Sequence, residues 1–364
     1  MLSRFEAKSR LQWSIILKIS LFWMLIGSIN VCLMHLAIDN EYLQATPAYN
    51  FRLIFWINTL GGALAGFLSG ATLVFVMRER FRQVSFLASL LINTAVILLL
   101  YFILSLIFSF LFYAQELQEP LFSDAVRQRV WDIQGSRFNL RTFFFWMFVI
   151  VGTIIVLQIS DKYGPGMLVK MLLGKYHRPF EENRIFMFLD MRSSTSIAER
   201  LGHIQFHNLL NDFFSDITNP ILYSSGEIYQ YVGDEVIVSW TMEEGLTDAH
   251  CLTCYQKINQ SITQRAPYYL QHYGLVPEFK AGLHCGLVTT GEIGVIKKDV
   301  VYSGDVLNTA SRIQNMCNEL GVNLLFSDRL LNLLDLPPHQ FQTRKVTDIQ
   351  LRGKNARMSL YTLD

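Results

Sequence analysis

Charged residues are nearly absent from four long stretches within the first 160 residues of this 364-residue chain. Only 17% of the whole sequence is charged, while 51% is hydrophobic, which excludes an ordinary soluble protein. A helix needs roughly 20 apolar residues to cross the hydrocarbon core of a bilayer. The four stretches, each of about this length, are 13–36, 53–77, 85–114 and 142–160. We therefore predict that residues 1–160 form an all-α transmembrane domain of four helices, in contact with membrane lipid.

The chain also lacks a basic excess and a complete set of zinc ligands. Its formal net charge is +1, whereas nucleic-acid binding needs a basic patch or stripe, so we predict no nucleic-acid partner. Cys251 and Cys254 form a C-x2-C pair, but no second cysteine pair or histidine pair completes a zinc site. We therefore expect the five cysteines to be free thiols in a reducing cytosol.

Lysine and arginine are unevenly distributed around the four stretches. They precede the first stretch and follow the second and the fourth, whereas Arg52 is the one basic residue of the loop 37–52. The loop 113–141 has four arginines but also four acids, which weakens the asymmetry. Basic residues are enriched in cytoplasmic loops. We therefore predict a multi-pass protein of the plasma (inner) membrane, with both termini and the domain after residue 160 in the cytoplasm.

The composition changes to that of a soluble α/β domain after a short linker. The GPG sequence at 164–166 interrupts the last apolar stretch, and we place a linker at 161–180 and a second domain at 181–364. Periods of 2 and 3.6 in the apolar residues predict strands and helices there. The expected strands are 184–189, 226–231, 235–240, 279–289, 323–326, 346–351 and 360–363, and the expected helices are 195–223, 246–273 and 305–318. This order predicts a β-α-β-β-α-β, ferredoxin-like α/β (α+β) domain with additions at its end.

Two aspartates lie where this fold brings strand ends together. Asp190 follows the first strand, and Asp234 lies in the tight turn of a strand–GDE–strand hairpin. The first strand and the hairpin are central neighbours in such a sheet, so the two carboxylates can lie close together. They repel each other, and a divalent cation stabilises the pair; Mg²⁺ and Mn²⁺ prefer oxygen ligands and substrate phosphates. Taken singly, each aspartate can equally cap a turn or a helix.

Polar residues at two helix starts suit a phosphorylated ligand. Ser194 and Thr195 lead into a helix whose N-terminal N–H groups can bind phosphate, although such residues are also plain N-caps. Asn308 and Arg312, in GDVLNTASRIQ, are spaced i, i+4 and share one helix face. An amide and a guanidinium on one face can bind a ribose and a developing phosphoryl charge, or they can form an exposed polar face.

The strand that ends at Asp190, the YVGDE hairpin and GDVLNTASR together resemble the catalytic domain of class III nucleotidyl cyclases. The resemblance covers the soluble part of the chain and includes LRGKNARMSLYTL near its end. It implies that Asp190 and Asp234 bind two Mg²⁺ or Mn²⁺ ions per site. It further implies that Asn308 orients the ribose, that Arg312 stabilises the pentavalent phosphorus and that Lys354 contacts the triphosphate.

The resemblance implies a reaction and an assembly. The ribose 3′-oxygen of ATP or GTP attacks the α-phosphate, which gives a 3′,5′-cyclic nucleotide for signal transduction and pyrophosphate. The sites of the family form between two catalytic domains. Since all four metal and transition-state positions are present in this chain, a homodimer would have two equivalent sites.

Two positions depart from the family pattern. Gln230 lies where ATP-using cyclases generally have lysine and GTP-using cyclases have glutamate, and Val301 lies where adenylyl cyclases usually have aspartate or threonine. An amide can pair with adenine or with guanine, and a valine side chain cannot form a hydrogen bond to a base. We therefore expect an adenylate cyclase with loose purine selectivity, for which GTP is the second candidate substrate.

Alternatives to an active cyclase come from other classes. A cyclase-like domain can bind a nucleotide or a partner without turnover, as a sensory module, and the unusual Gln230–Val301 pair favours this reading. A diguanylate cyclase would have GGDE where this chain has VGDE at 232–235, and it would leave NTASR unexplained. The membrane domain is either an anchor that assists dimerisation or a sensor of a lipid, a membrane state or a small ligand. The small residues at 61–70 favour close helix packing in both cases.

Overall fold

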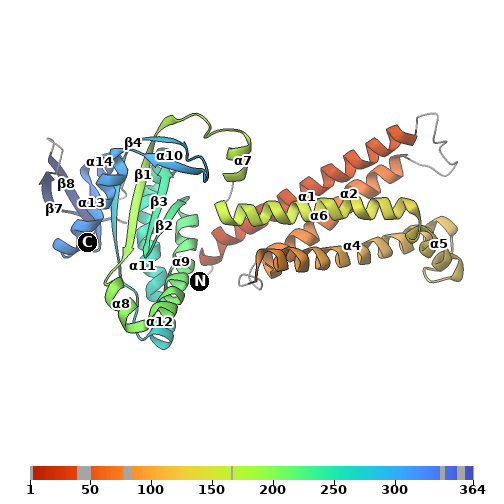
Figure 1. Ribbon diagram of the computed structural model, residues 1–364, viewed down its shortest axis with the longest axis horizontal. Coiled ribbons are helices and arrows are strands. Elements are labelled where there is room, and N and C mark those ends of the chain that lie inside the picture. The colour runs from red at the N-terminus through yellow and green to blue at the C-terminus, as the bar shows by residue number, and fades with distance from the viewer. Residues whose placement is uncertain are drawn as a thin grey trace. The chain divides into compact units, whose positions relative to one another are not determined.

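The computed structural model describes residues 3–38, 51–77, 84–164, 167–336, 341–350 and 357–363. The chain folds into two compact units, of which one is Ser9–Leu168 and the other contains Val169–Asp364 (Figure 1). The first is helical and the second combines a mixed sheet with helices, so the predicted fold class is confirmed.

The helical unit contains four long apolar helices and one short helix. The elements are α1 (Ser3–Ile38), α2 (Phe51–Ala71) with its π-helical continuation η1 (Thr72–Met77), α4 (Phe86–Leu117), α5 (Asp124–Gln134) and α6 (Arg137–Tyr163). Among the described residues, four segments are long and apolar enough to cross a membrane: Ser9–Leu36, Phe51–Met77, Phe86–Leu117 and Asn139–Asp161. Helix α5 lies within 113–141, where we expected a loop; the Ser123 hydroxyl caps it by accepting a hydrogen bond from the Val126 N–H.

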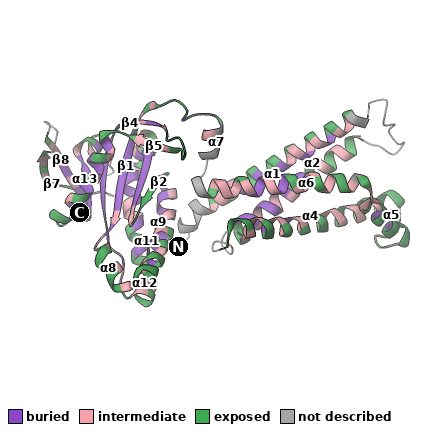
Figure 2. Ribbon diagram, viewed as in Figure 1, coloured by how far each residue is buried: buried purple, intermediate pink, exposed green. Residues whose placement is uncertain are grey.

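Small residues allow α2 to lie close to α1, as the sequence at 61–70 predicted. A Cβ added to Gly66 would be 2.9 Å from the Cβ of Trp23, and one added to Gly62 would be 2.8 Å from the Trp23 carbonyl oxygen. The Trp23 indole N–H donates to the Thr153 hydroxyl of α6 at 3.0 Å. Figure 2 shows that the long helices keep many residues exposed, and these include large apolar side chains such as Leu21 and Leu91. Such an apolar outer surface suits contact with lipid.

The second unit is built on one eight-stranded sheet. Its strands are β1 (Phe180–Met191), β2 (Glu227–Val232), β3 (Glu235–Thr241), β4 (Phe279–Ile293), β5 (Asp299–Ser303), β6 (Leu324–Ser327), β7 (Thr343–Gln350) and β8 (Arg357–Leu363). The order is β2-β3-β1-β4-β6-β8-β7, and β5 pairs with β4 outside this path. Strand β1 is therefore central and runs antiparallel to both β3 and β4. The sequence did not predict β5, a five-residue strand whose pairing depends on the long partner β4.

Two helices expected as single segments are interrupted. The helix expected at 195–223 divides into α8 (Ser194–Leu201) and α9 (His203–Tyr223), because Gly202 between them adopts a φ of +76°. The helix expected at 246–273 divides further: Asp248 and Ala249 each have a φ of +48°, and Pro267 lies in the first turn of the last part, where proline is well tolerated. The resulting elements are α10 (Met242–Leu246), η2 (Thr247–Ala249), α11 (His250–Gln264) and α12 (Ala266–Tyr273).

The remaining helices are α7 (Met167–Leu172), α13 (Asp305–Glu319) and α14 (Asp328–Leu331).

Alternate residues of β1 face opposite sides of the sheet, as the period of a strand requires. Leu189 and its odd-numbered neighbours pack in the large core with α9 and α11. Phe186 and Phe188 pack instead with Val306 and Ala310 of α13. Asp190 therefore lies on the face of β1 that α13 covers.

Candidate active site

The end of β1 and the β2–β3 turn bring two carboxyl groups into contact. Asp190 is opposite Glu235, the first residue of β3, and Asp234 precedes Glu235 in the turn. Gly233 has a φ of +64°, which glycine adopts at no steric cost. Burial raises the pKa of the Asp190 carboxyl, and its hydrogen bond to the Asp234 carboxyl raises the pKa further. The two acids that the sequence singled out are thus side by side.

A third carboxyl group, Glu235, belongs to the same cluster. Because it is opposite Asp190 across the ladder, the two side chains share one face of the sheet. Burial, followed by the charges of Asp190 and Asp234, raises the pKa of Glu235 to about 7. We did not assign Glu235 to the site from the sequence, although it was visible as the last letter of GDE.

Two residues that we did not predict hold Asp190 from other elements. The Lys280 ammonium of β4 is 3.2 Å from Asp190 Oδ2, and the Lys280 residue is only 7% exposed. The Gln314 amide of α13 donates to the same oxygen at 3.0 Å. A lysine within a buried strand was the signal for Lys280, since lysine is almost never fully buried unless it is paired. The Lys280 ammonium thus pairs with Asp190, one of three neighbouring carboxyl groups, and an acidic excess remains.

The donor set suits a hard divalent cation. Within the described ranges, no group of three or more His, Cys, Asp or Glu side chains has the geometry of a complete metal site. Asp190 and Asp234 supply carboxylate oxygens, and Mg²⁺ is usually bound through one or two carboxylates together with substrate phosphates. These residues therefore fit a cation that a nucleotide helps to hold.

Asn308 and Arg312 lie on the other side of α13 from the residues that face the sheet. Val306, Ala310 and Gln314 are buried, whereas Asn308 and Arg312 are exposed. Residues of a helix are about 100° apart, so Asn308 is roughly opposite Ala310 and its neighbours. Within one chain it is Gln314, and not the predicted pair, that α13 directs to Asp190.

The two predicted base-contacting positions lie on β2 and β5. Gln230 is exposed and Val301 is half-buried. Their neighbours Tyr229 and Tyr302 form an edge-to-face pair with ring centroids 4.9 Å apart. The Tyr302 backbone N–H also donates to the Tyr229 hydroxyl oxygen at 3.4 Å. Strands β2 and β5, which do not pair with each other, are therefore connected through these two rings.

Of the residues predicted to contact phosphate, Ser194 and Thr195 lie within the described part of the chain. Ser194 and Thr195 begin α8, four and five positions after Asp190. Ser193 occupies the N-cap position with a φ of +54°, and its side chain makes no capping hydrogen bond. The residue at the N-cap position therefore does not cap α8 through its side chain. Lys354 lies outside the described residues.

Comparisons with known proteins identify the family of the second unit. Residues 176–364 match the family model described as the adenylate and guanylate cyclase catalytic domain. Adenylate cyclase 2 of Rhizobium meliloti (strain 1021) is 32% identical over 210 residues, which are 58% of this chain and 58% of that protein. The adenylate cyclase of Anabaena cylindrica is 27% identical over 181 residues, 48% of this chain and 35% of that protein. The chain thus spans between a third and three fifths of the length of these relatives.

Among solved structures, a bacterial light-regulated adenylyl cyclase has a similar fold. It aligns with a TM-score of 0.53 and 21% sequence identity, over 64% of this chain and 66% of that chain. The likeness supports the fold of the second unit.

Proposed function

The chain belongs to the adenylate and guanylate cyclase family, and from this membership we propose that it converts ATP into 3′,5′-cyclic AMP and pyrophosphate as a membrane-bound homodimer. The observation that carries the proposal is the strand register, which places Asp190 opposite Glu235 and so beside Asp234 in the β2–β3 turn, within an acidic cluster. A cluster with more carboxylates than cations favours binding of divalent ions and the phosphates that they bind.

Asp190 and Asp234 would hold two Mg²⁺ or Mn²⁺ ions, which supply activation of the 3′-oxygen and charge neutralisation of the leaving pyrophosphate when bound. Lys280 and Gln314 fix the orientation of Asp190, since both contact its Oδ2. Asn308 would orient the ribose. Arg312 would stabilise the charge that develops at the α-phosphate, because a guanidinium presents a planar fork of donors to phosphate oxygens.

The separation of these residues supports a homodimer. Asn308 and Arg312 are exposed on the side of α13 that faces away from the sheet, so a second copy of the chain can supply them to the Asp190–Asp234 pair. A two-fold axis then generates two equivalent sites, each with its acids from one copy and its amide and guanidinium from the other.

Further residues would contact the phosphates and the base of the nucleotide. Ser194 and Thr195 open α8 directly after Asp190, and the N–H groups of a helix N-terminus bind phosphate. Lys354 would contact the triphosphate. Gln230 and Val301 would contact the base, and since one is an amide and the other is apolar, discrimination between adenine and guanine is weak. Initial rates with equal concentrations of ATP and GTP check this point; a preference above about a hundredfold would contradict weak selection.

The apolar helices support insertion in the plasma (inner) membrane. Four segments are long and apolar enough to cross a bilayer. With an even number of crossings, the basic segment after residue 160 and the N-terminus lie on the same side, which we propose to be the cytoplasm. The catalytic unit then meets cytoplasmic ATP.

A second candidate function is a sensory module that binds nucleotide without turnover. It is favoured by Val301, whose side chain cannot form a hydrogen bond to a base. The two candidates differ in one assay, the formation of 3′,5′-cyclic product by the purified full-length chain in lipid nanodiscs with Mn²⁺ and ATP.

The assay is decisive with one pair of variants. Asp190→Asn removes one carboxylate of the acidic cluster, and we expect cyclic product to become undetectable. Asp348→Asn is the matched control, because Asp348 is an exposed carboxylate of β7 that pairs with Lys345, and it should retain the wild-type rate. A wild-type chain that binds ATP but forms no cyclic product would establish the sensory module instead.

A further inference from the structure

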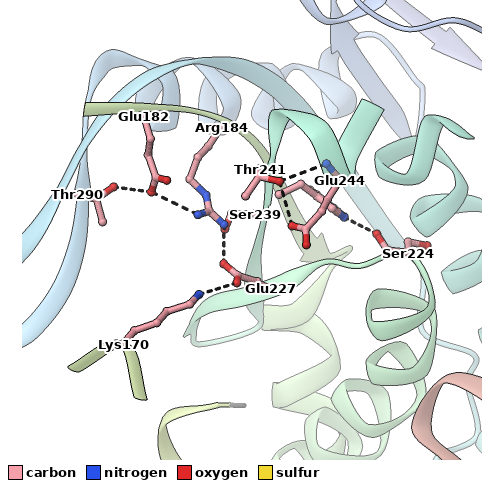
Figure 3. A network of polar contacts seen from close by, with 10 residues as sticks. Lys170, Glu182, Arg184, Ser224, Glu227, Ser239, Thr241, Glu244 and Thr290 are labelled. Atoms are coloured by element: carbon pink, nitrogen blue, oxygen red, sulfur yellow. Dashed lines mark hydrogen bonds and ion pairs between the residues drawn. The ribbon is translucent and has the colours of Figure 1, made fainter. Parts of the chain in front are cut away.

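The buried guanidinium of Arg184 joins several strands at the opposite end of β1 from Asp190. Arg184 is only 4% exposed. Its Nη2 is 2.6 Å from Glu227 Oε2 of β2 and 3.1 Å from the Ser239 hydroxyl of β3, and its Nη1 is 3.3 Å from Glu182 Oε1 (Figure 3). The Thr290 hydroxyl of β4 donates to that same Glu182 oxygen at 2.9 Å.

The same guanidinium also contacts β5. Its central carbon lies 4.9 Å from the centroid of the Tyr302 ring, within the range of a cation–π contact. Tyr302 packs edge-to-face on Phe186 as well, with centroids 5.4 Å apart. The guanidinium is thus in contact with a carboxylate of β2 and with an aromatic ring of β5.

These two strands carry the positions that we propose contact the base. Glu227 is three residues before Gln230 on β2, and Tyr302 directly follows Val301 on β5. Strand β2 is at the edge of the sheet, and β5 pairs with β4 outside the main strand order. The ladder between β2 and β3 also shifts register between Ile228 and Gln230. Backbone pairing therefore fixes the relative positions of β2 and β5 less firmly than those of the central strands.

We propose that Arg184 is a positioning residue for purine binding: it sets the distance between the base-contacting strands β2 and β5 through Glu227 and Tyr302. This inference rests on the proposed cyclase function and names a determinant of the base subsite. Arg184 itself does not touch the nucleotide, because it is buried beneath Tyr302 and Glu227. A lysine at this position would keep the charge but lose the planar fork that contacts a carboxylate and a ring at once.

The test compares Arg184→Lys with Arg192→Lys in the full-length chain. Arg192 is a matched control, because it directly follows β1 and its guanidinium donates three hydrogen bonds, to Asn323, Asn318 and the Val322 carbonyl, away from β2 and β5. We expect Arg184→Lys to raise the KM for both ATP and GTP about tenfold, which is the effect of about 1.4 kcal/mol of lost binding, with kcat within about twofold. Arg192→Lys should leave both constants unchanged.

Inhibition by pyrophosphate separates positioning from general damage. Pyrophosphate has no base, so its inhibition constant should be the same in Arg184→Lys as in the wild-type chain. An equal rise in the inhibition constant and in the KM values, or KM values equal to those of Arg192→Lys, would overturn the proposal.

A second variant keeps the test informative if Arg184→Lys does not fold. Tyr302→Leu removes the ring and leaves the Arg184–Glu227 pair intact, and we expect it to raise the same KM values without changing pyrophosphate inhibition. If the wild-type chain makes no cyclic product, the proposed function has failed, and this inference is then measured as the affinity for a non-hydrolysable ATP analogue. An unchanged affinity in both variants would overturn it.

Discussion

The two ends of β1 carry opposite arrangements of charge on the same face of one strand. At the Asp190 end, the carboxyl groups of Asp190, Asp234 and Glu235 lie together, and the Lys280 ammonium pairs with Asp190. At the Arg184 end, two cations balance two carboxylates: Lys170 of α7 is 3.0 Å from Glu227 Oε1, and Arg184 contacts both Glu227 and Glu182. A network whose charges balance needs no external ion, whereas an acidic excess is stabilised by a bound cation. We therefore assign the Asp190 end to catalysis and the Arg184 end to the positioning of the base-contacting strands.

Removal of an acid from the unbalanced end should give the largest effect. We expect Asp234→Asn to lower the rate of cyclic-nucleotide formation by about a thousandfold or more, since metal ions supply several kcal/mol of transition-state stabilisation. The midpoint of thermal unfolding should not fall, because the substitution relieves repulsion with Asp190 and Glu235. Activity assays and thermal unfolding of the same sample check both statements, and a lower midpoint together with retained activity would refute the assignment.

Removal of the cation from the balanced end should act on stability instead. Arg184→Met leaves Glu182 and Glu227 without their shared partner. Loss of one member of a buried pair costs about 3–5 kcal/mol, and we reduce the expected loss of unfolding free energy to about 1–3 kcal/mol because both carboxylates are partly exposed. Denaturant unfolding of the full-length chain measures the change. A free energy of unfolding equal to that of the wild-type chain would contradict a stabilising role for the Arg184 contacts.

The stability that the Arg184 end contributes should also decrease at low pH. Burial alone would raise the pKa of Glu227, but the charges and hydrogen bonds of Arg184 and Lys170 outweigh burial and hold this pKa below its usual value of 4.5. An acid whose pKa is lowered by folding adds stability above its unfolded pKa and loses it as the pH falls through the folded value. Below about pH 4.5, the free energy of unfolding should therefore fall less steeply in Glu227→Gln than in the wild-type chain. Identical acid unfolding curves for the two chains would contradict this.

The smallest effect is expected at the outer end of the network. Lys170 and Glu227 are both partly exposed, and exposed ion pairs contribute about 0–1 kcal/mol. Lys170→Met should therefore change the unfolding free energy by less than about 1 kcal/mol and leave the KM for ATP within about twofold. A tenfold change in KM would mean that α7 governs the base subsite and that Arg184 does not act alone.

Features that depend on residues close together in the sequence could be predicted from it. Asp190 and Asp234 could be singled out because each directly follows a strand or occupies a turn, and the topology of the sheet then places them together. The four apolar helices were equally visible, since composition alone defines them. The small residues at 61–70 predicted close helix packing, and the structure identifies the partner of α2 as α1.

The residues that sequence reasoning missed depend on distant pairing. Lys280 and Gln314 reach Asp190 from β4 and α13, about 90 and 124 positions along the chain, and no local pattern records such contacts. Arg184 was read as one residue of an apolar strand, because its partners Glu227 and Tyr302 are also remote. The helices are interrupted where local backbone conformation prevailed over apolar periodicity, through positive φ at Gly202, Asp248 and Ala249 and through the proline at 267.

In the proposed homodimer, the acids of one copy act with the guanidinium of the other. The most direct test of this arrangement joins two inactive chains, Asp190→Asn and Arg312→Ala, carrying different tags so that mixed dimers can be purified. Each variant alone should form no cyclic product. The mixed dimer contains one site with both lesions and one site with none, so we predict about half of the wild-type rate per dimer. A mixed dimer as inactive as its two parents would show that Asp190 and Arg312 do not meet across the interface.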